Sequence, residues 1–167
     1  MSSSSGFTFL PLGALIQEFK VNGVNIVQGF HNADQYKKYN APYFGETIGR
    51  VANRVSHAKI DSLAGKSWQL VQNNGPNSLH GGTNGYGKRT WDGPKDEERH
   101  GKKATKFELK DKHLEEGYPG TVEARVWYWP SVEKKDGKEV QVLEFELEAE
   151  LVGDEVEETA IALTNHR

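Results

Sequence analysis

Several features that often define a protein's chemistry are missing from this sequence. None of its 167 residues is cysteine, which excludes disulfide bonds and metal sites built on thiolates. No uninterrupted apolar run approaches the roughly 20 residues that a membrane-spanning helix needs, so no membrane partner is expected. The formal net charge of -3 gives no electrostatic reason to bind nucleic acid either.

The start of the chain is also poor in signals. Residues 1–6, with four serines and a glycine, are expected to form a flexible N-terminal tail. They have neither the basic start nor the apolar core of a secretory signal, so the expected location is cytoplasmic. Residues 7–167 show no internal repeat and no linker, and their number fits one domain.

Alternating patterns predict antiparallel strands. In residues 140–151, leucine, phenylalanine and alanine alternate with four glutamates, and residues 121–129 alternate in the same way. A period of two indicates a half-buried strand with one face in water, so the glutamates are expected to be a charged sheet face. Asn22-Gly23 within residues 15–28 is typical of a two-residue hairpin turn.

Further short elements complete the prediction. A second hairpin is expected from residues 59–63 and 67–71, and a last strand from residues 159–164. Residues 32–39 favour one or two helical turns with Asn32 as N-cap. The mixed charges of residues 94–103 indicate a solvated surface loop. Short strands separated by turn signals predict an all-β fold, an antiparallel β-sandwich.

Two side chains suggest a polar ligand site. Arg54 follows Asn53, and a guanidinium offers five donors in a fixed fork that can hold several oxygens of one small ligand. His80 stands between a turn and two glycines, which let the backbone approach a ligand closely. An arginine and a histidine at the ends of short strands are compatible with a polyol site.

Four motifs then carry a resemblance. They are FGETIGRVANR at 44–54, NNGPNSLHGG at 73–82, EEGYPG at 115–120 and LTNH at 163–166. In this order they resemble the motifs of the aldose 1-epimerase (galactose mutarotase) family. The resemblance implies a galactose mutarotase-like β-sandwich that interconverts the α and β anomers of free hexoses such as galactose or glucose. It implies a small-molecule sugar as partner and acid–base chemistry with no metal or organic cofactor.

The resemblance also assigns roles. His166 matches the family's acid at the ring oxygen, and His80 matches its second catalytic histidine. Arg54 matches the arginine that binds sugar hydroxyls, and Asn53 lies on the same loop. A histidine suits the acid because its ordinary pKa is near neutral pH.

The family domain is longer than this chain. Its catalytic glutamate and a substrate-binding aspartate come after the point corresponding to Arg167, where the family continues with Ser-Tyr-Phe or similar. The chain therefore resembles the N-terminal part of a truncated sandwich, whose uncovered apolar face would invite a homo-oligomer or a complementary C-terminal chain. Glu115 and Glu116 are conceivable but weak substitutes for the missing base.

Two other functions stay open. One is a non-catalytic sugar-binding or structural fragment, and the other is a hexose-6-phosphate 1-epimerase, which would need a basic group for the phosphate. Tyr86 and Trp91 are weak candidates for lining a sugar cleft, since aromatic rings pack against sugars. The remaining histidines show no metal-binding spacing. The sequence does not indicate which sugar is preferred.

Overall fold

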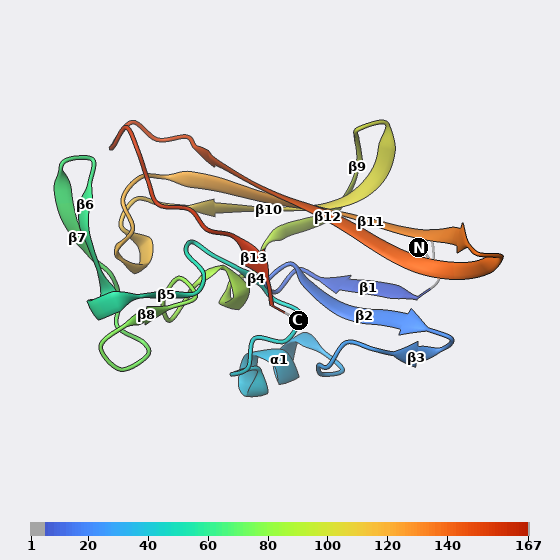
Figure 1. The fold of residues 1–167 in the computed structure, drawn as a ribbon. Helices are drawn as coiled ribbons and strands as arrows, with labels where there is room; N and C mark the ends of the chain where they lie inside the picture. The colour runs from blue at the N-terminus through green and yellow to red at the C-terminus, as the bar shows by residue number, and fades with distance from the viewer. Residues whose placement is uncertain (1–5, 167) are drawn as a thin grey trace.

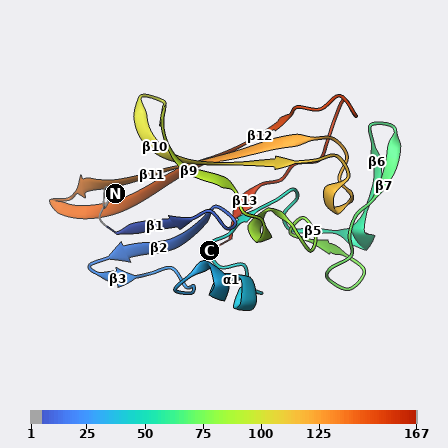
Figure 2. The same ribbon diagram turned by 180° about the vertical axis from the view of Figure 1, so that it is seen from behind.

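A computed structural model describes residues 6–166. Its two main sheets lie one above the other (Figures 1 and 2). The larger sheet has the order β12-β11-β10-β9 and the smaller one the order β1-β2-β3. The strands of the larger sheet are β9 (Asp92–Arg99), β10 (Lys102–Asp111), β11 (Val122–Lys135) and β12 (Lys138–Leu151), and those of the smaller are β1 (Phe7–Leu10), β2 (Leu15–Val21) and β3 (Val24–Asn25).

Smaller elements sit at one end of these sheets. Three two-stranded pairs are β4 (Thr47–Ile48) with β13 (Thr164–Asn165), β5 (Arg54–Val55) with β8 (Ser78–Leu79), and β6 (Lys59–Leu63) with β7 (Lys66–Gln69). The helices of the described residues are α1 (Ala33–Tyr39) and the 3-10 turns η1 (Ser56–Ala58), η2 (Tyr86–Lys88) and η3 (Glu115–Gly117).

The core lies between the two main sheets. Ile16 of β2 is fully buried in one cluster with Phe107 of β10 and Val126 of β11. Phe9 of β1 stacks on Tyr128 of β11 with ring centroids 4.4 Å apart, and the Tyr128 hydroxyl donates to the Ala14 carbonyl over 2.7 Å. Two antiparallel sheets that share one apolar core make a β-sandwich, so the predicted fold class is confirmed.

Several local predictions are confirmed as well. Asn22 and Gly23 have φ angles of 50° and 79°, as a type I′ turn between β2 and β3 requires. The Asn32 side chain accepts a hydrogen bond of 3.0 Å from the Gln35 amide and so caps α1. The predicted hairpin of β6 and β7 is present, with its turn at Ala64 and Gly65.

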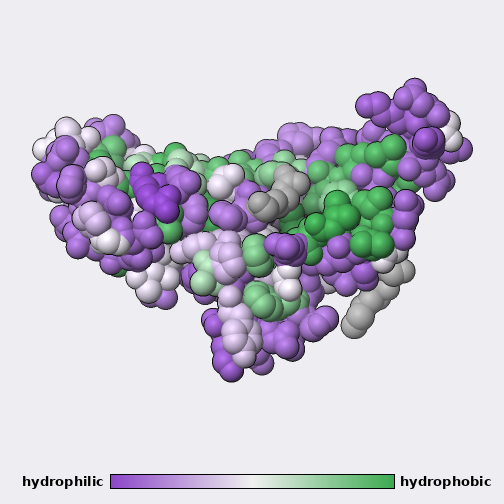
Figure 3. Space-filling model, turned by 60° about the horizontal axis from the view of Figure 1, so that its bottom comes forward, coloured by the Kyte–Doolittle hydropathy of each residue, from purple (hydrophilic) through white to green (hydrophobic). Residues whose placement is uncertain are grey.

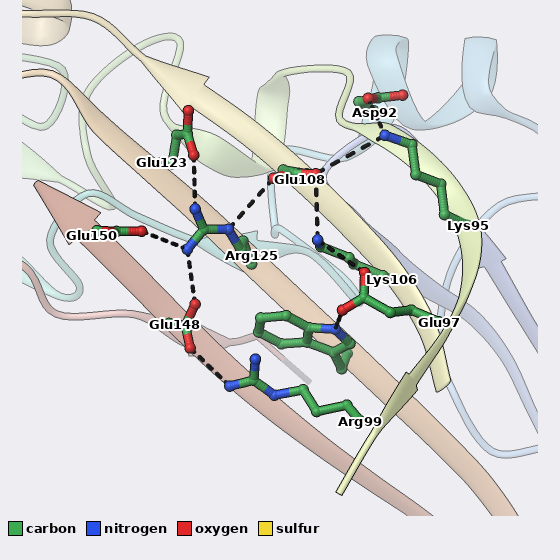
Figure 4. A network of polar contacts seen from close by, with 11 residues as sticks. Asp92, Lys95, Glu97, Arg99, Lys106, Glu108, Glu123, Arg125, Glu148 and Glu150 are labelled. Atoms are coloured by element: carbon green, nitrogen blue, oxygen red, sulfur yellow. Dashed lines mark hydrogen bonds and ion pairs between the residues drawn. The ribbon is translucent and has the colours of Figure 1, made fainter. Parts of the chain in front are cut away.

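The prediction of a surface loop over residues 94–103 is wrong. These residues belong to β9 and the start of β10, which pair as an antiparallel hairpin. Cross-strand charges hold it, as Figure 4 shows: Lys106 contacts Glu97 over 3.0 Å, and the Arg99 guanidinium contacts Glu148 over 2.7 Å. Since the strand is charged on both faces, it lacks the apolar alternation by which a strand is normally recognised.

Other strand boundaries also differ from the prediction. β11 ends at Lys135, so it includes Lys134 and Lys135, which were predicted to belong to the turn. The tight turn is confined to Asp136 and Gly137. The expected strand over residues 159–164 is reduced to β13, preceded by a single parallel bridge between Val51 and Ala162.

Of the expected tail, residues 1–5 lie outside the described residues. The Gly6 carbonyl accepts a hydrogen bond of 2.6 Å from the Lys20 amide. None of the helices among residues 6–166 has the length and apolar character to cross a membrane.

Apolar residues also reach the surface. Seen from below, hydrophobic residues form a band on the molecule (Figure 3). Separately, an apolar groove of about 310 Å³ is lined by Phe19, Ile26, Val27 and Phe44. Ile26 and Val24 are 59% and 66% exposed. The expectation that a second chain covers an apolar face of the sandwich stays a prediction.

Candidate active site

Strand pairing brings Arg54 and His80 together. β5 and β8 are antiparallel with Arg54 opposite Leu79, so His80 comes directly after the paired residue. The His80 amide donates to the Asn53 carbonyl over 2.9 Å. Gly81 follows at a φ of 86°, and a Cβ there would lie 1.9 Å from the Gly49 carbonyl oxygen. Only glycine fits this close approach, which fixes the second motif against the first.

A second pair of strands brings in His166. β13 pairs with β4, and the His166 amide donates to the Glu46 carbonyl over 2.9 Å. The Gly45 amide in turn donates to the His166 carbonyl over 2.8 Å. The backbone of the fourth motif is therefore bound to the backbone of the first, across about 120 residues of chain.

These contacts build one cleft of about 460 Å³. It is lined by Ala52, Asn53, His80, Ala162, Leu163, Thr164, Asn165 and His166. The two imidazoles meet edge to face with centroids 5.3 Å apart, and the Nδ1 atom of each is buried without a hydrogen-bond partner among the described residues. The fold thus brings both predicted histidines and Asn53 to one cleft.

The surroundings of His80 disfavour its protonation. Burial is the largest cause, followed by electrostatic interaction with His166, Arg54 and Lys88, and together they lower the pKa of His80 to about 4. At neutral pH this ring is therefore neutral, with one nitrogen to donate and one to accept a hydrogen bond.

Arg54 stands at the edge of the cleft. Its Nε donates to the Asn74 side chain over 2.9 Å and its Nη1 to the Asn53 side chain over 3.1 Å. Arg54 does not line the cleft directly, but it is bound to Asn53, which does. These contacts link Arg54 to the predicted site.

Arg50, four residues earlier, has a different environment. Its side chain is fully buried, and it contacts Asp111 over 2.5–2.7 Å and the Pro119 carbonyl over 2.6 Å. The two arginines of the first motif therefore lie in different environments. Arg50 is bound in the interior, and Arg54 lies at the edge of the cleft.

The aromatic candidates were chosen wrongly. Tyr86 and Trp91 are 1% and 2% exposed, and they pack in the core, where the Tyr86 hydroxyl donates to Asp111. The aromatic residue at the histidines is instead Tyr43, whose ring lies 4.8 Å from that of His80 and 5.9 Å from that of His166. The sequence gives little signal for Tyr43, because its ring reaches the histidines only through the turn at a φ of 63°.

Glu115 and Glu116 have structural partners. Glu115 contacts Arg89 over 2.9 Å and accepts from the Lys112 amide. Glu116 accepts hydrogen bonds from the amides of Thr83 and Asn84. The bonds of Glu116 hold the loop after His80. Within residues 6–166 no cluster of histidine and acidic side chains forms a metal site.

Comparison with known proteins decides the family. The sequence profile described as aldose 1-epimerase matches residues 2–167. The chain belongs to the aldose 1-epimerase family. It is 40% identical over 158 residues to the bifunctional protein GAL10 of Pachysolen tannophilus, covering 92% of this chain and 22% of that one. It is 37% identical over 142 residues to galactose mutarotase of Bos taurus, covering 85% and 36%.

Solved structures of aldose epimerases show the same fold. The GalM/aldose epimerase homologue of C. elegans aligns with a TM-score of 0.71 at 29% identity, over 95% of this chain and 45% of that one. Galactose 1-epimerase of Lactobacillus acidophilus aligns with a TM-score of 0.74 at 24% identity, over 99% and 46%, and supports the fold alone. The chain spans less than half the length of each of these relatives. The predicted family is confirmed, and the roles of the individual site residues stay predictions.

Proposed function

We propose that the cleft is an aldose 1-epimerase site that binds a free hexose and exchanges protons with it during anomer interconversion. The observation that carries the proposal is the pair of imidazoles from the second and fourth motifs, 5.3 Å apart in one cleft. The family supports the reaction class, and the amide and imidazole side chains that line the cleft support a small sugar.

The chemistry requires a proton donor at the ring oxygen. When the anomeric hydroxyl loses its proton to a base, its electrons form the C1 carbonyl, the bond from C1 to the ring oxygen breaks, and the ring oxygen takes a proton. We assign that donation to His166, whose Nδ1 is buried without a partner among the described residues. After rotation about the C1–C2 bond, the steps reverse and give the other anomer.

His80, Asn53 and Arg54 have binding roles in this proposal. The neutral His80 ring donates to or accepts from a sugar hydroxyl, because its low pKa keeps it uncharged. The Asn53 amide lines the cleft, and Arg54 is bound to its oxygen. A sugar hydroxyl that donates to the Asn53 oxygen, or accepts from the Arg54 guanidinium, would be held at the edge of the cleft.

A second function, sugar binding without turnover, has its own support. The two carboxylates considered as a base, Glu115 and Glu116, are bound to Arg89 and to backbone amides. Neither carboxylate is therefore assigned as the proton acceptor for the anomeric hydroxyl.

Polarimetry separates these functions. Freshly dissolved α-D-galactose and α-D-glucose are followed to equilibrium with the wild-type chain, with His166→Gln, with His80→Gln and with His31→Gln as a control outside the cleft. Catalysis above the buffer rate that falls by about 10²-fold or more in His166→Gln, but not in the control, supports the epimerase. Saturable sugar binding without catalysis supports the second function, and neither binding nor catalysis by a folded chain refutes both.

A further inference from the structure

Near the imidazoles lies an ion pair whose carboxylate is buried and whose lysine side chain is 29% exposed. The Lys88 ammonium lies 2.8 Å from Glu46 Oε1 and donates to the Asn40 carbonyl over 2.7 Å. The Glu46 side chain is 1% exposed and also accepts from the Asn40 side-chain nitrogen over 2.7 Å. A Cβ at Gly87 would lie 2.2 Å from Glu46 Oε2, so the carboxylate is closely enclosed. Its place is fixed from several sides.

The pair contacts the site through one ring. The Lys88 ammonium lies 4.0 Å from the centroid of the Tyr43 ring, and the same ring contacts both imidazoles. A cation over an aromatic face is attracted by the ring quadrupole, and the attraction is stronger where water is excluded. The Glu46 backbone also binds the backbones of Tyr43 and His166. Its amide donates to the Tyr43 carbonyl, and its carbonyl accepts from the His166 amide.

We propose that Lys88, anchored on Glu46, is a positioning residue that seats the Tyr43 ring against both imidazoles and holds a positive charge near His80. Lys88 acts through Tyr43 and through its charge, without touching the sugar. The groups that act on the charge of His80 are His166, Arg54 and Lys88. The Glu46 carboxylate contacts Lys88. Of these, Lys88 is the cation whose place is fixed by a buried carboxylate.

A geometric parallel elsewhere in the chain offers a matched control. Lys106 on β10 contacts Glu97 over 3.0 Å and lies 5.5 Å from the Trp127 ring. This is the same combination of lysine, glutamate and aromatic ring, but it lies on the outer face of the larger sheet (Figure 4). Lys106→Met removes a comparable cation away from the cleft.

The test is an NMR titration of the histidines in the full labelled chain. The signals are assigned with His80→Gln and His166→Gln, and the pKa of His80 is measured in wild type, Lys88→Met, Lys88→Arg and Lys106→Met. We expect Lys88→Met to raise the pKa of His80 by about 1, because it removes a nearby positive charge and leaves Glu46 unpaired. Lys88→Arg keeps the positive charge, so the pKa of His80 should stay within about 0.3 of the wild-type value. Lys106→Met should leave the pKa of His80 unchanged.

Positioning has a separate readout. Cross-relaxation signals between the Tyr43 and His80 rings should weaken in Lys88→Met. The double variant Glu46→Gln/Lys88→Met removes both charges and leaves no unpaired buried charge, so we expect it to fold and to show the same weakening. An unchanged His80 pKa in folded Lys88→Met, or unchanged ring signals in either variant, would overturn the proposal. The relevance of Lys88 to turnover rests on the proposed function. The NMR signals do not depend on turnover, so the positioning role and the proposed function can be refuted separately.

Discussion

The two polar regions of the molecule differ in how their groups are satisfied. On the outer face of the larger sheet, Arg125 contacts four carboxylates, those of Glu108, Glu123, Glu148 and Glu150, all at 3.4 Å or less (Figure 4). In the cleft, His80 and His166 each bury an Nδ1 atom that has no partner among the described residues. A region with satisfied charges serves stability and solubility, whereas buried groups left without partners are available to a ligand.

The regions also shift carboxyl pKa values in opposite directions. Hydrogen bonds from Arg99 are the first cause that lowers the pKa of Glu148 on the sheet. Burial is the first cause that raises the pKa of Glu46 behind the cleft and of Asp111 below it. The ionised form of the exposed carboxylates on the sheet is thus stabilised by hydrogen-bond partners. The ionised form of the interior carboxylates is destabilised by desolvation.

The largest expected effect on stability comes from breaking the buried ion pair of Arg50 and Asp111. Asp111→Asn removes the charge that faces the fully buried Arg50 guanidinium. We expect a loss of about 3–5 kcal/mol in the free energy of unfolding, because an unpaired buried charge remains. Urea unfolding measures it. A loss below about 1 kcal/mol would mean that this pair is as weak as a surface pair.

The matching change on the sheet should cost less. Arg125→Met is expected to lower the unfolding free energy by about 1 kcal/mol, since the ion pairs face water. The difference between variant and wild type should also shrink in about 1 M NaCl, because salt screens exposed charges. A cost as large as that of Asp111→Asn, and independent of salt, would remove the distinction between the regions.

The pH dependence should have opposite signs in the two regions. The folded pKa of Glu148 is lowered, so its stabilising contribution is present above its unfolded pKa and is lost as pH falls through the folded value. Glu148→Gln should therefore make stability fall less between pH 7 and pH 3. The folded pKa of Glu46 is raised, so its ionised form opposes folding at neutral pH, and the opposition fades as pH falls.

Glu46→Gln should accordingly make stability fall more steeply toward acid than in wild type. Urea unfolding at several pH values compares the two variants. Identical pH profiles for Glu148→Gln and Glu46→Gln would contradict the assigned directions.

The smallest effect on stability is expected at the cleft edge. Arg54→Lys keeps the charge but loses the fork that binds Asn74 and Asn53. The unfolding free energy should change by less than about 0.5 kcal/mol, while sugar binding weakens about tenfold. Urea unfolding and a sugar titration measure the two effects. Unchanged sugar affinity would exclude Arg54 from the site.

Sequence reasoning succeeded where one local signal decides the structure. The alternation in β12 and the Asn22-Gly23 turn are of this kind, and both are confirmed. It failed for β9, whose charges find partners only across the sheet. His80 and His166 could be named from motifs, but Tyr43, Lys88 and Glu46 act through contacts between distant segments. No local periodicity encodes such contacts.

The central claim is that the cleft, and not the charged sheet face, receives the sugar. The direct measurement is a titration of the isotope-labelled chain with D-galactose, following amide and imidazole signals. We predict saturable shifts at Asn53, His80 and Asn165, and none in β9 or at Arg125. Saturable shifts confined to the sheet face, or none at the cleft of a folded chain, would contradict the account.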